Sequence, residues 1–263
     1  MGTFTPMSNA AVSETAIAPH PELQGFYRGT ENKRSFLRHI FDETATDYDR
    51  VERLLALGSG RWYRRQALVR SGLVAGMRVL DVATGTGLVA REAIGIVGLA
   101  GRVVGVDPSA GMIGQAHASL PGLAAVLGCG EALPLADGQF NFVSMGYALR
   151  HLPDLHVAFA EFARVLRPGG RLCVLEITRP HGVIRRQLLR TYFRVALPVA
   201  ERVIHTSPAT RRLWQYYWET IDQCVTPAVV LGALRDAGFA RVEQRLSMGL
   251  FSEYTAMKPD SVG

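Results

Sequence analysis

Two acidic residues follow apolar runs at a spacing that is typical of a ligand pocket. The apolar run that begins at residue 77 reaches Asp81, and a loop of small residues, 83–87, comes next. A second apolar run, 101–106, ends at Asp107. Glycine in such a loop lets a ligand approach the backbone, because no Cβ stands in its way. A carboxylate after the second run can accept hydrogen bonds from a ribose diol, so the pattern predicts a nucleotide-type pocket.

The order of residues in the loop limits which ligand this pocket would take. Residues 83–87 read Ala-Thr-Gly-Thr-Gly, which lacks the G-x-G-x-x-G order that suits a pyrophosphate. No Gly-Lys-Ser/Thr follows, which excludes a P-loop. A ligand with a ribose and no phosphate fits better, and S-adenosylmethionine is such a ligand. The alternative is a tight strand-to-helix turn that binds nothing, which the spacing to Asp107 makes the weaker interpretation.

Strand and helix patterns alternate along the chain and would bring these residues to one edge of a sheet. Strand, loop, helix, strand is the order of a doubly wound α/β fold, in which ligands bind beyond the carboxyl ends of the strands. Further strands are expected at 123–127, 140–145 and 171–177, with a terminal antiparallel hairpin of strands at 240–246 and 250–256.

More candidate contacts to a ligand follow the predicted strands. Pro108 and Met112 begin a helix after Asp107, where Met112 is either plain core or an apolar wall for an adenine ring. The small-residue loop 128–131 follows the strand at 123–127, at the edge where a parallel sheet places its ligand crevice.

The composition is that of a globular chain. It has 263 residues, 48% hydrophobic and 20% charged, enough for one large α/β domain. Its three cysteines show neither a metal-ligand spacing nor a disulfide framework, so we expect no metal and a cytoplasmic location. We find neither a signal-peptide pattern nor an apolar run that would span a bilayer. The formal net charge of +6 favours anionic partners, although nucleic acid is not expected among them.

The segments before residue 76 differ in pattern from the rest. Residues 1–75 are expected to form an N-terminal arm, loose over 1–22, followed by lid helices, and 76–263 to form the core domain. The segment 41–49 has a polar face that includes Tyr48. It is either a surface helix or a lid over the pocket.

An arginine-rich segment interrupts the alternation of strands and helices. Residues 179–218 contain eight arginines and a single acid, Glu201, with apolar and aromatic residues between them. A basic amphipathic helix of this kind lies on an anionic membrane surface or caps a pocket for an acidic substrate. A solvated helix face packed on the domain would leave the same pattern. We expect a basic helical insertion at about 179–220 over the active site, with the membrane contact slightly favoured.

Four sequence blocks carry a resemblance to a known family. They are residues 79–87, 130–137, 148–151 and 164–172. Their order and spacing resemble those of class I S-adenosylmethionine-dependent methyltransferases, and within these the ubiquinone/menaquinone biosynthesis C-methyltransferases, over roughly residues 41–254. The resemblance implies a Rossmann-like, seven-stranded, mostly parallel sheet with an antiparallel last strand and a helical lid.

The resemblance also implies positions for the cofactor. Asp107 would hold the ribose hydroxyls, Gly146 would lie beside the sulfonium, and Tyr48 matches a lid tyrosine of the family. Cys129 stands where the family usually has an acceptor for the adenine amino group, and a thiol is a weak acceptor. The complete set of cofactor-binding residues expected is Tyr48, Asp81, Ala83, Gly85, Thr86, Asp107, Pro108, Met112, Cys129, Gly130, Glu131 and Gly146.

Methylation at a ring carbon needs a phenol or hydroquinone that has lost its hydroxyl proton. His151, where the quinone family usually has Asn, is the candidate base, and Arg150 would stabilise the phenolate. A histidine that only caps or packs is the alternative for His151. We therefore expect methyl transfer to a small aromatic or quinol-like acceptor. Natural-product O- or N-methylation and a cofactor-binding protein without catalysis are the other interpretations, and the sequence leaves a homodimer open.

Overall fold

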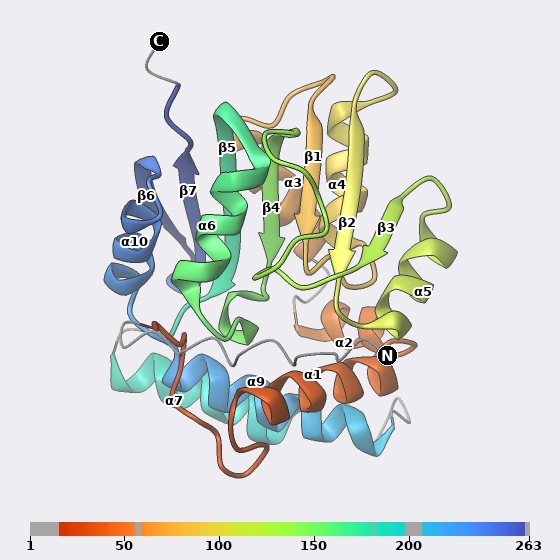
Figure 1. The fold of residues 1–263 in the computed structure, drawn as a ribbon. Coiled ribbons are helices and arrows are strands. Elements are labelled where there is room, and N and C mark those ends of the chain that lie inside the picture. The colour runs from red at the N-terminus through yellow and green to blue at the C-terminus, as the bar shows by residue number, and fades with distance from the viewer. Residues whose placement is uncertain (1–15, 56–58, 181, 198–206, 261–263) are drawn as a thin grey trace, which may run out of the picture.

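A central sheet organises the chain (Figure 1). The structure is a computed structural model, which describes residues 16–55, 59–180, 182–197 and 207–260. These residues form a seven-stranded sheet in the order β3-β2-β1-β4-β5-β7-β6. The strands are β1 Arg78–Val82, β2 Arg102–Asp107, β3 Ala124–Leu127, β4 Phe140–Gly146, β5 Leu166–Ile177, β6 Ala240–Ser247 and β7 Phe251–Met257.

The direction of the strands confirms the predicted doubly wound sheet with an antiparallel last strand. β1 pairs in parallel with β2 and β4, with Leu80 opposite Val104 and Val143. β7 lies antiparallel to both β5 and β6, so the terminal hairpin is also confirmed. Because strand order reverses between β1 and β4, the carboxyl ends of these two strands border a crevice.

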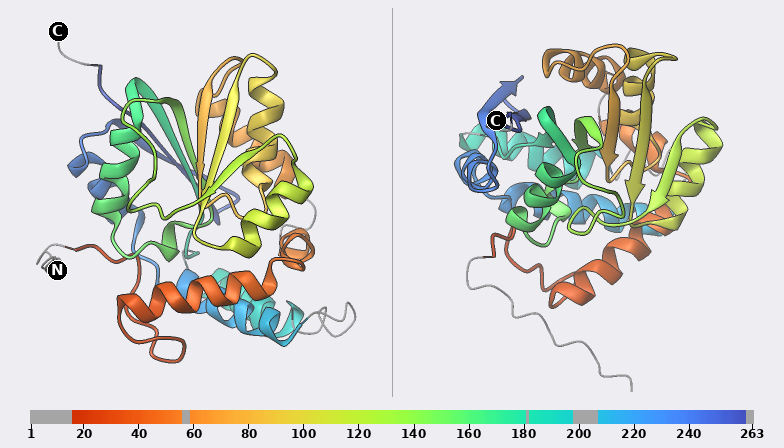
Figure 2. Two further views of the ribbon diagram at one scale, coloured as in Figure 1. Left: turned by 45° about the vertical axis from the view of Figure 1, so that its right-hand side comes forward. Right: turned by 45° about the horizontal axis from the view of Figure 1, so that its top comes forward.

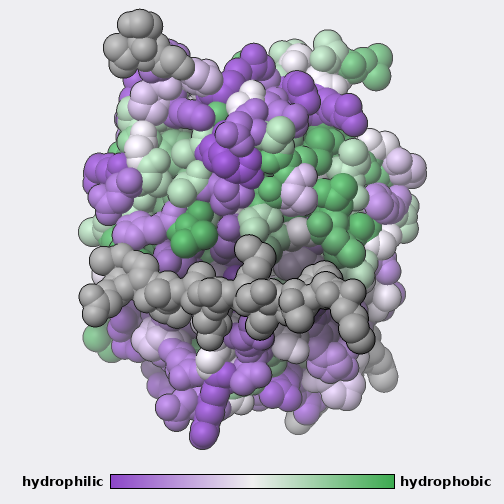
Figure 3. Space-filling model, in the orientation of Figure 1, coloured by the Kyte–Doolittle hydropathy of each residue, from purple (hydrophilic) through white to green (hydrophobic). Residues whose placement is uncertain are grey.

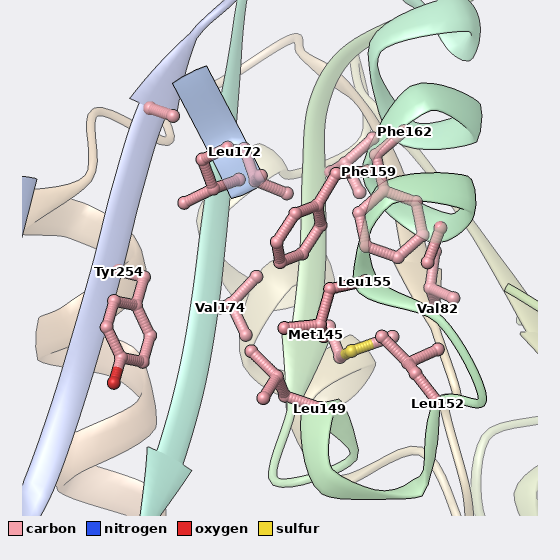
Figure 4. Packing of buried hydrophobic residues seen from close by; sticks show 14 of the residues in the cluster. Val82, Met145, Leu149, Leu152, Leu155, Phe159, Phe162, Leu172, Val174 and Tyr254 are labelled. Carbon is pink, nitrogen blue, oxygen red and sulfur yellow. The ribbon is translucent and has the colours of Figure 1, made fainter. Parts of the chain in front are cut away.

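Helices cover both faces of the sheet (Figure 2). One face packs against α3 Gly60–Arg70, α4 Leu88–Val97 and α5 Ala110–Ser119, and the other against α6 Leu155–Val165 and α10 Pro227–Asp236. Figure 4 shows Phe159 and Phe162 of α6 packed toward Val82 and Val174 of the sheet. Burial on both faces explains why the strands read as apolar runs without alternation.

A further layer of helices lies beyond the carboxyl ends of the parallel strands (Figure 1). It contains α1 Thr30–Thr44, α2 Tyr48–Leu55, α7 Val183–Thr191, the π-helical turn η2 Tyr192–Ala196 and α9 Pro208–Gln223. Its own apolar cluster joins α1, η2 and α9 through Ile40, Phe193 and Trp214. This layer is the helical lid that the fold class implied. Residues 198–206 of the arginine-rich segment lie outside the described residues.

The N-terminal segment differs in part from the expected loose arm. Residues 1–15 lie outside the described residues, but residues 17–20 are bound to the core. Leu155 donates its backbone N–H to Ile17, and Val225 donates its own to Pro19, at 3.0 and 2.8 Å. Backbone pairing of this kind carries no side-chain pattern, so composition alone does not predict it.

Candidate active site

A cavity of about 530 Å³ lies between the carboxyl ends of the strands and the helical layer. Its walls combine the loops after β1, β2, β3 and β4 with α1, Tyr48 and the short 3₁₀ helix η1 Leu149–His151. The structure brings these residues of the expected set to the cavity: Tyr48, Ala83, Gly85, Asp107, Pro108, Met112, Cys129, Gly130, Glu131, Gly146 and His151.

The loop after β1 is held in shape by Asp81, which lies behind the cavity wall. Its carboxylate accepts hydrogen bonds from Thr84 Oγ1 at 2.8 Å and Ser144 Oγ at 2.7 Å. Burial raises the pKa of Asp81 to about 6. Ala83 and Gly85 have positive φ angles of 53° and 55°, so the loop turns tightly with its backbone toward the cavity.

Asp107 lies at the end of β2, as the ribose-binding pattern requires. One carboxylate oxygen accepts from the Gly85 N–H at 2.8 Å, and the other from the Ser109 N–H at 2.9 Å. Desolvation raises the pKa of Asp107 to about 6, while these two N–H groups lower it. Each carboxylate oxygen has a second lone pair, which leaves Asp107 able to accept from a ligand hydroxyl.

The start of α5 fixes the next part of the wall. Ser109 caps the helix by accepting from the Met112 N–H at 3.0 Å, which buries the Met112 side chain beside the cavity. Asp42 of α1 accepts from the Gly111 N–H at 2.9 Å and from Ser109 Oγ at 2.5 Å. The helical layer is thus joined to the wall that Asp107 begins.

The loop after β3 meets α1 at another side of the cavity. Cys129 and Glu131 line the cavity there, together with Lys33. Lys33 is buried and donates through Nζ to the carbonyl oxygen of Leu152 at 2.9 Å. Burial lowers the pKa of Lys33 to about 8, and nearby Glu131 raises it in part. Burial raises the pKa of the Cys129 thiol, which therefore stays protonated.

His151 lies among aromatic side chains at the end of η1. Its Nδ1 is 3.0 Å from the hydroxyl of Tyr216 in α9, and its ring stacks on those of Tyr216 and Tyr217. Phe41 meets the imidazole edge to face, with ring centroids 5.4 Å apart. Burial, together with the charges of Arg150 and Lys33, lowers the pKa of His151 well below its ordinary value. The imidazole is therefore neutral at pH 7.

Arg150 points away from the main cavity. It is buried and pairs with Glu176, and its guanidinium lies 4.8 Å from the centroid of the Tyr217 ring. It borders a second cavity of about 80 Å³, lined by Tyr48, Glu52, Tyr147, Arg150, Ile177, Leu189, Tyr192, Phe193, Tyr217, Leu250 and Phe251. Tyr48 and Tyr147 line both cavities, so these two rings stand where the cavities adjoin.

Two more residues of the expected set lie outside the main cavity. Asp81 organises the loop from behind, and Thr86 donates through Oγ1 to Asp49 of α2 at 2.6 Å. Sequence reasoning missed Tyr147, whose φ of 59° is unusual for a bulky residue and marks a constrained position directly after β4. It also missed four of the five residues of α1 that line the cavity, which are Lys33, Arg34, Leu37 and Arg38; the fifth, Phe41, begins the segment 41–49 that was considered as a lid. The apolar spacing of α1 signals a helix but not what the helix covers.

The residues around the cavity fit S-adenosylmethionine. Gly85 lines the cavity, and a Cβ there would stand in open space, with no protein atom within 4 Å. Asp107 offers an acceptor for ribose hydroxyls, and Met112 and Leu127 give apolar walls for adenine. Among the described residues, no cluster of His, Cys, Asp and Glu could hold a metal ion. No helix in the described part of the chain is both long and apolar enough to cross a membrane.

Comparison with known sequences gives one consistent family. The model of the ubiE/COQ5 methyltransferase family matches residues 29–258. The ubiquinone/menaquinone biosynthesis C-methyltransferase UbiE of Hahella chejuensis is 31% identical over 86% of this chain and 92% of its own length. The demethylmenaquinone methyltransferase of Chlorobaculum parvum is 33% identical over 80% of this chain and 87% of its own.

Solved structures agree on the fold. A SAM-dependent methyltransferase from Aquifex aeolicus superposes with a TM-score of 0.57 at 20% identity, over 80% of this chain and 97% of that one. An S-adenosylmethionine-dependent methyltransferase from Mesorhizobium loti gives 0.53 at 20% identity, over 76% and 99%. At this identity the likeness concerns the fold alone. With the family match over most of its length, the chain belongs to the ubiE/COQ5 methyltransferase family and is an S-adenosylmethionine-dependent methyltransferase.

Proposed function

We propose that the chain methylates a ring carbon of a small aromatic, quinol-like acceptor. The observation that carries this proposal is the neutral imidazole of His151 at the cavity wall, surrounded by aromatic rings and by two buried cations. The relatives named as ubiquinone/menaquinone C-methyltransferase and demethylmenaquinone methyltransferase support an acceptor of the quinol class. Phe41, Tyr48 and Tyr147 offer flat, apolar surfaces against which an aromatic ring can pack.

The electrostatics of the site favour an ionised acceptor. Burial is the largest cause of the low pKa of His151, and it would raise the pKa of a ring hydroxyl bound there. The positive charges of Arg150 and Lys33, which also lower the pKa of His151, act in the opposite direction on that hydroxyl and favour its ionised form. A phenolate makes its ring carbons electron-rich, which carbon methylation requires. Arg150 acts here through its field, because it lines the second cavity rather than the main one.

His151 is placed to move the hydroxyl proton. When its Nδ1–H donates to the Tyr216 oxygen, Nε2 keeps a lone pair that can accept the proton of a ring hydroxyl. Burial raises the pKa of Tyr216 well above its ordinary value, so its hydroxyl stays protonated and holds the imidazole in orientation. S-adenosylmethionine, when bound, supplies a methyl group on a sulfonium that is already a good leaving group. Proximity and exclusion of water by the helical layer then supply much of the remaining acceleration.

The position of the transferred methyl tests the proposal. The full chain is incubated with ¹³C-methyl S-adenosylmethionine and a reduced 2-alkyl-1,4-naphthoquinone or 2-alkyl-benzoquinone, and the product is analysed by NMR. We expect the label on a ring carbon. Label on oxygen would favour the natural-product O-methyltransferase interpretation, and turnover with amines alone would favour N-methylation. The family assignment goes against the third interpretation, a binding protein without catalysis.

Replacement of His151 tests its role in the reaction. His151→Phe keeps a flat ring at the position but cannot take up a proton, and we expect kcat to fall roughly 10²- to 10⁴-fold. The acceptor KM and the affinity for S-adenosylhomocysteine should change little. Tyr216→Phe is the matched variant, since it removes only the orienting hydroxyl and should lower kcat less. A His151→Phe variant with wild-type kcat would show that His151 only packs.

A further inference from the structure

The helix α7 exposes its aliphatic residues to solvent. Val183, Ile184 and Leu188 are 85%, 77% and 67% exposed. None of the nine residues of α7 is buried. Isolated exposed aliphatic residues are ordinary on a protein surface, but Ile184 and Leu188 lie one turn apart on one side of this helix, with Val183 at its start, and form an exposed aliphatic strip.

The opposite side of α7 is the one that holds it to the protein. Arg186 binds Asp222 of α9 through two hydrogen bonds of 2.6 and 2.7 Å. Leu189 lines the second cavity. At 100° per residue these two positions lie on the side of the helix away from Ile184 and Leu188. The aliphatic strip therefore faces outward because of how the helix is anchored.

Arginines flank the strip on both sides. Residues 179–197 contain five arginines and no aspartate or glutamate. Asp222 and Glu219 of α9 pair with Arg186 and Arg194, at 2.6 and 3.1 Å. The segment therefore keeps an excess of positive charge beside its exposed aliphatic residues.

The turn between β6 and β7 lies beside α7. The Nη1 atom of Arg185 lies 2.8 Å from where a Cβ on Gly249 would stand, which places this arginine against the turn. Met248 in the same turn is 72% exposed. By contrast, the lower part of the face seen in Figure 3, which α1 crosses, is mostly hydrophilic. We call the surface made by Val183, Ile184, Leu188 and Met248, with Arg185 and Arg190, the α7 face.

We propose that the α7 face docks the protein on an anionic lipid bilayer. A short helix with an outward aliphatic strip and flanking arginines has the features of a helix that lies in a membrane interface, with aliphatic side chains in the acyl region and guanidinium groups at the headgroups. The positive charge selects anionic over neutral lipid, and salt screens the attraction. A protein partner would have to bring acidic groups to pair with these arginines. A second copy that docked through the same face could not supply them from α7, because α7 contains no aspartate or glutamate.

The same segment also forms the wall of the second cavity, through Leu189, Tyr192 and Phe193. Docking by the α7 face would therefore bring that apolar cavity next to the bilayer surface. This consequence rests on the proposed function, because it makes the bilayer the source of an apolar acceptor. The docking itself depends on neither the acceptor nor the reaction.

Co-sedimentation of the full chain with vesicles tests the proposal. Vesicles of phosphatidylcholine with phosphatidylglycerol, and of phosphatidylcholine alone, are compared at about 0.02 and about 0.5 M NaCl. No methyl donor or acceptor is added, so the result is independent of the proposed function. We expect binding to the anionic vesicles at low salt, much weaker binding at high salt, and little binding to the neutral vesicles. Absence of binding to anionic vesicles at low salt would overturn the proposal.

Matched variants locate the contact. The double variant Ile184→Gln/Leu188→Gln should lower the partition onto anionic vesicles roughly tenfold or more, and Arg185→Gln/Arg190→Gln should remove most of its salt dependence. The control, Leu99→Gln/Arg102→Gln, changes an exposed leucine before β2 and the exposed arginine that begins β2, at the opposite end of the sheet (Figure 1). It should bind as the wild type does. Because all of these side chains are exposed, each variant should have the circular dichroism spectrum and the melting temperature of the wild type.

Two results would show that the α7 face does not dock on lipid. Equal loss of vesicle binding in the control and in the α7 variants would show that binding depends on the net charge of the protein and not on the α7 face. Sedimentation velocity without lipid is the second measurement. A wild-type dimer that Ile184→Gln/Leu188→Gln dissociates would make a second copy the occupant. Either result overturns the proposal.

Discussion

At the scale of single residues, Asp107 both shapes the site and is available to the ligand. It ties the loop after β1 to the start of α5 through Gly85 and Ser109, and its carboxylate lines the cavity. We predict that Asp107→Ala weakens binding of S-adenosylhomocysteine by about 1.5–3 kcal/mol, the range for hydrogen bonds to a charged group. Isothermal titration calorimetry measures this loss directly. Unchanged affinity would place Asp107 outside the binding site.

The raised pKa of Asp107 gives the same prediction a pH dependence. Above about pH 6 the carboxylate is ionised and accepts from the ligand, and as the pH falls through about 6 it takes up a proton and the affinity should fall. Asp81, whose pKa is also raised to about 6, titrates in the same range. The variant Asp107→Asn separates the two carboxylates, because any change of affinity near pH 6 that persists in this variant belongs to another group.

The sequence predicted Asp107 but not the surroundings of His151. An acid after an apolar run marks the end of a strand, and strand ends in a parallel sheet share one edge, so local pattern was enough for Asp107 and Gly85, whereas Gly146 followed from the family resemblance. The partners of His151 come from α9, 65 residues along the chain. The spacing of apolar residues in α9 does not show which face of this helix meets η1, since that depends on how the helical layer packs.

At the scale of elements, the Arg150–Glu176 ion pair joins η1 to the end of β5. Both side chains are 2% exposed, and Glu176 also accepts from the Arg150 backbone N–H at 3.2 Å. We predict that Arg150→Met lowers the free energy of unfolding by about 3–5 kcal/mol, because it leaves a buried carboxylate without its partner. Urea denaturation measures the change.

Two further variants check the origin of that loss. The double variant Arg150→Met/Glu176→Gln removes both charges and should recover much of the stability lost in Arg150→Met. Arg194→Met breaks the exposed pair with Glu219 and should change stability far less. Equal losses in Arg150→Met and Arg194→Met would show that the buried pair does not hold η1 to β5.

The elements themselves were predictable to different degrees. The strands of the sheet follow from their apolar runs, and the hairpin β6–β7 follows from the turn at residues 247–249. The arginine-rich segment was expected as a basic helix, and it contains α7, the π-helical turn η2 and α9. A π turn such as η2 adds a residue to one turn and shifts the helix face, so spacing alone does not show that Phe193 is buried while Val195 is exposed.

At the scale of the whole molecule, the helical layer and the sheet have separate apolar clusters. The cluster of the layer contains Ile40, Phe193 and Trp214, and those of the sheet pack under α4 and α6. The main cavity lies between them. Polar contacts join the two bodies at its edge, among them Thr86 with Asp49 at 2.6 Å. Such an arrangement predicts that the layer opens as a unit at a lower free energy than the sheet.

Hydrogen exchange followed by mass spectrometry tests this opening in the full chain. Without ligand, amides of α1, α2 and α9 should exchange faster than those of β1 and β4. Residues of the helical layer and of the strand ends both line the cavity, so a ligand bound there should stabilise the closed layer. At a concentration of about 100 times Kd, S-adenosylhomocysteine should raise the free energy of layer opening by about 2.7 kcal/mol, since the open form cannot hold it. The opposite outcome is that amides of α1 and α9 exchange at the same rate as those of β1, both with and without ligand. The layer and the sheet would then open together, and a ligand would have to reach the cavity by another route.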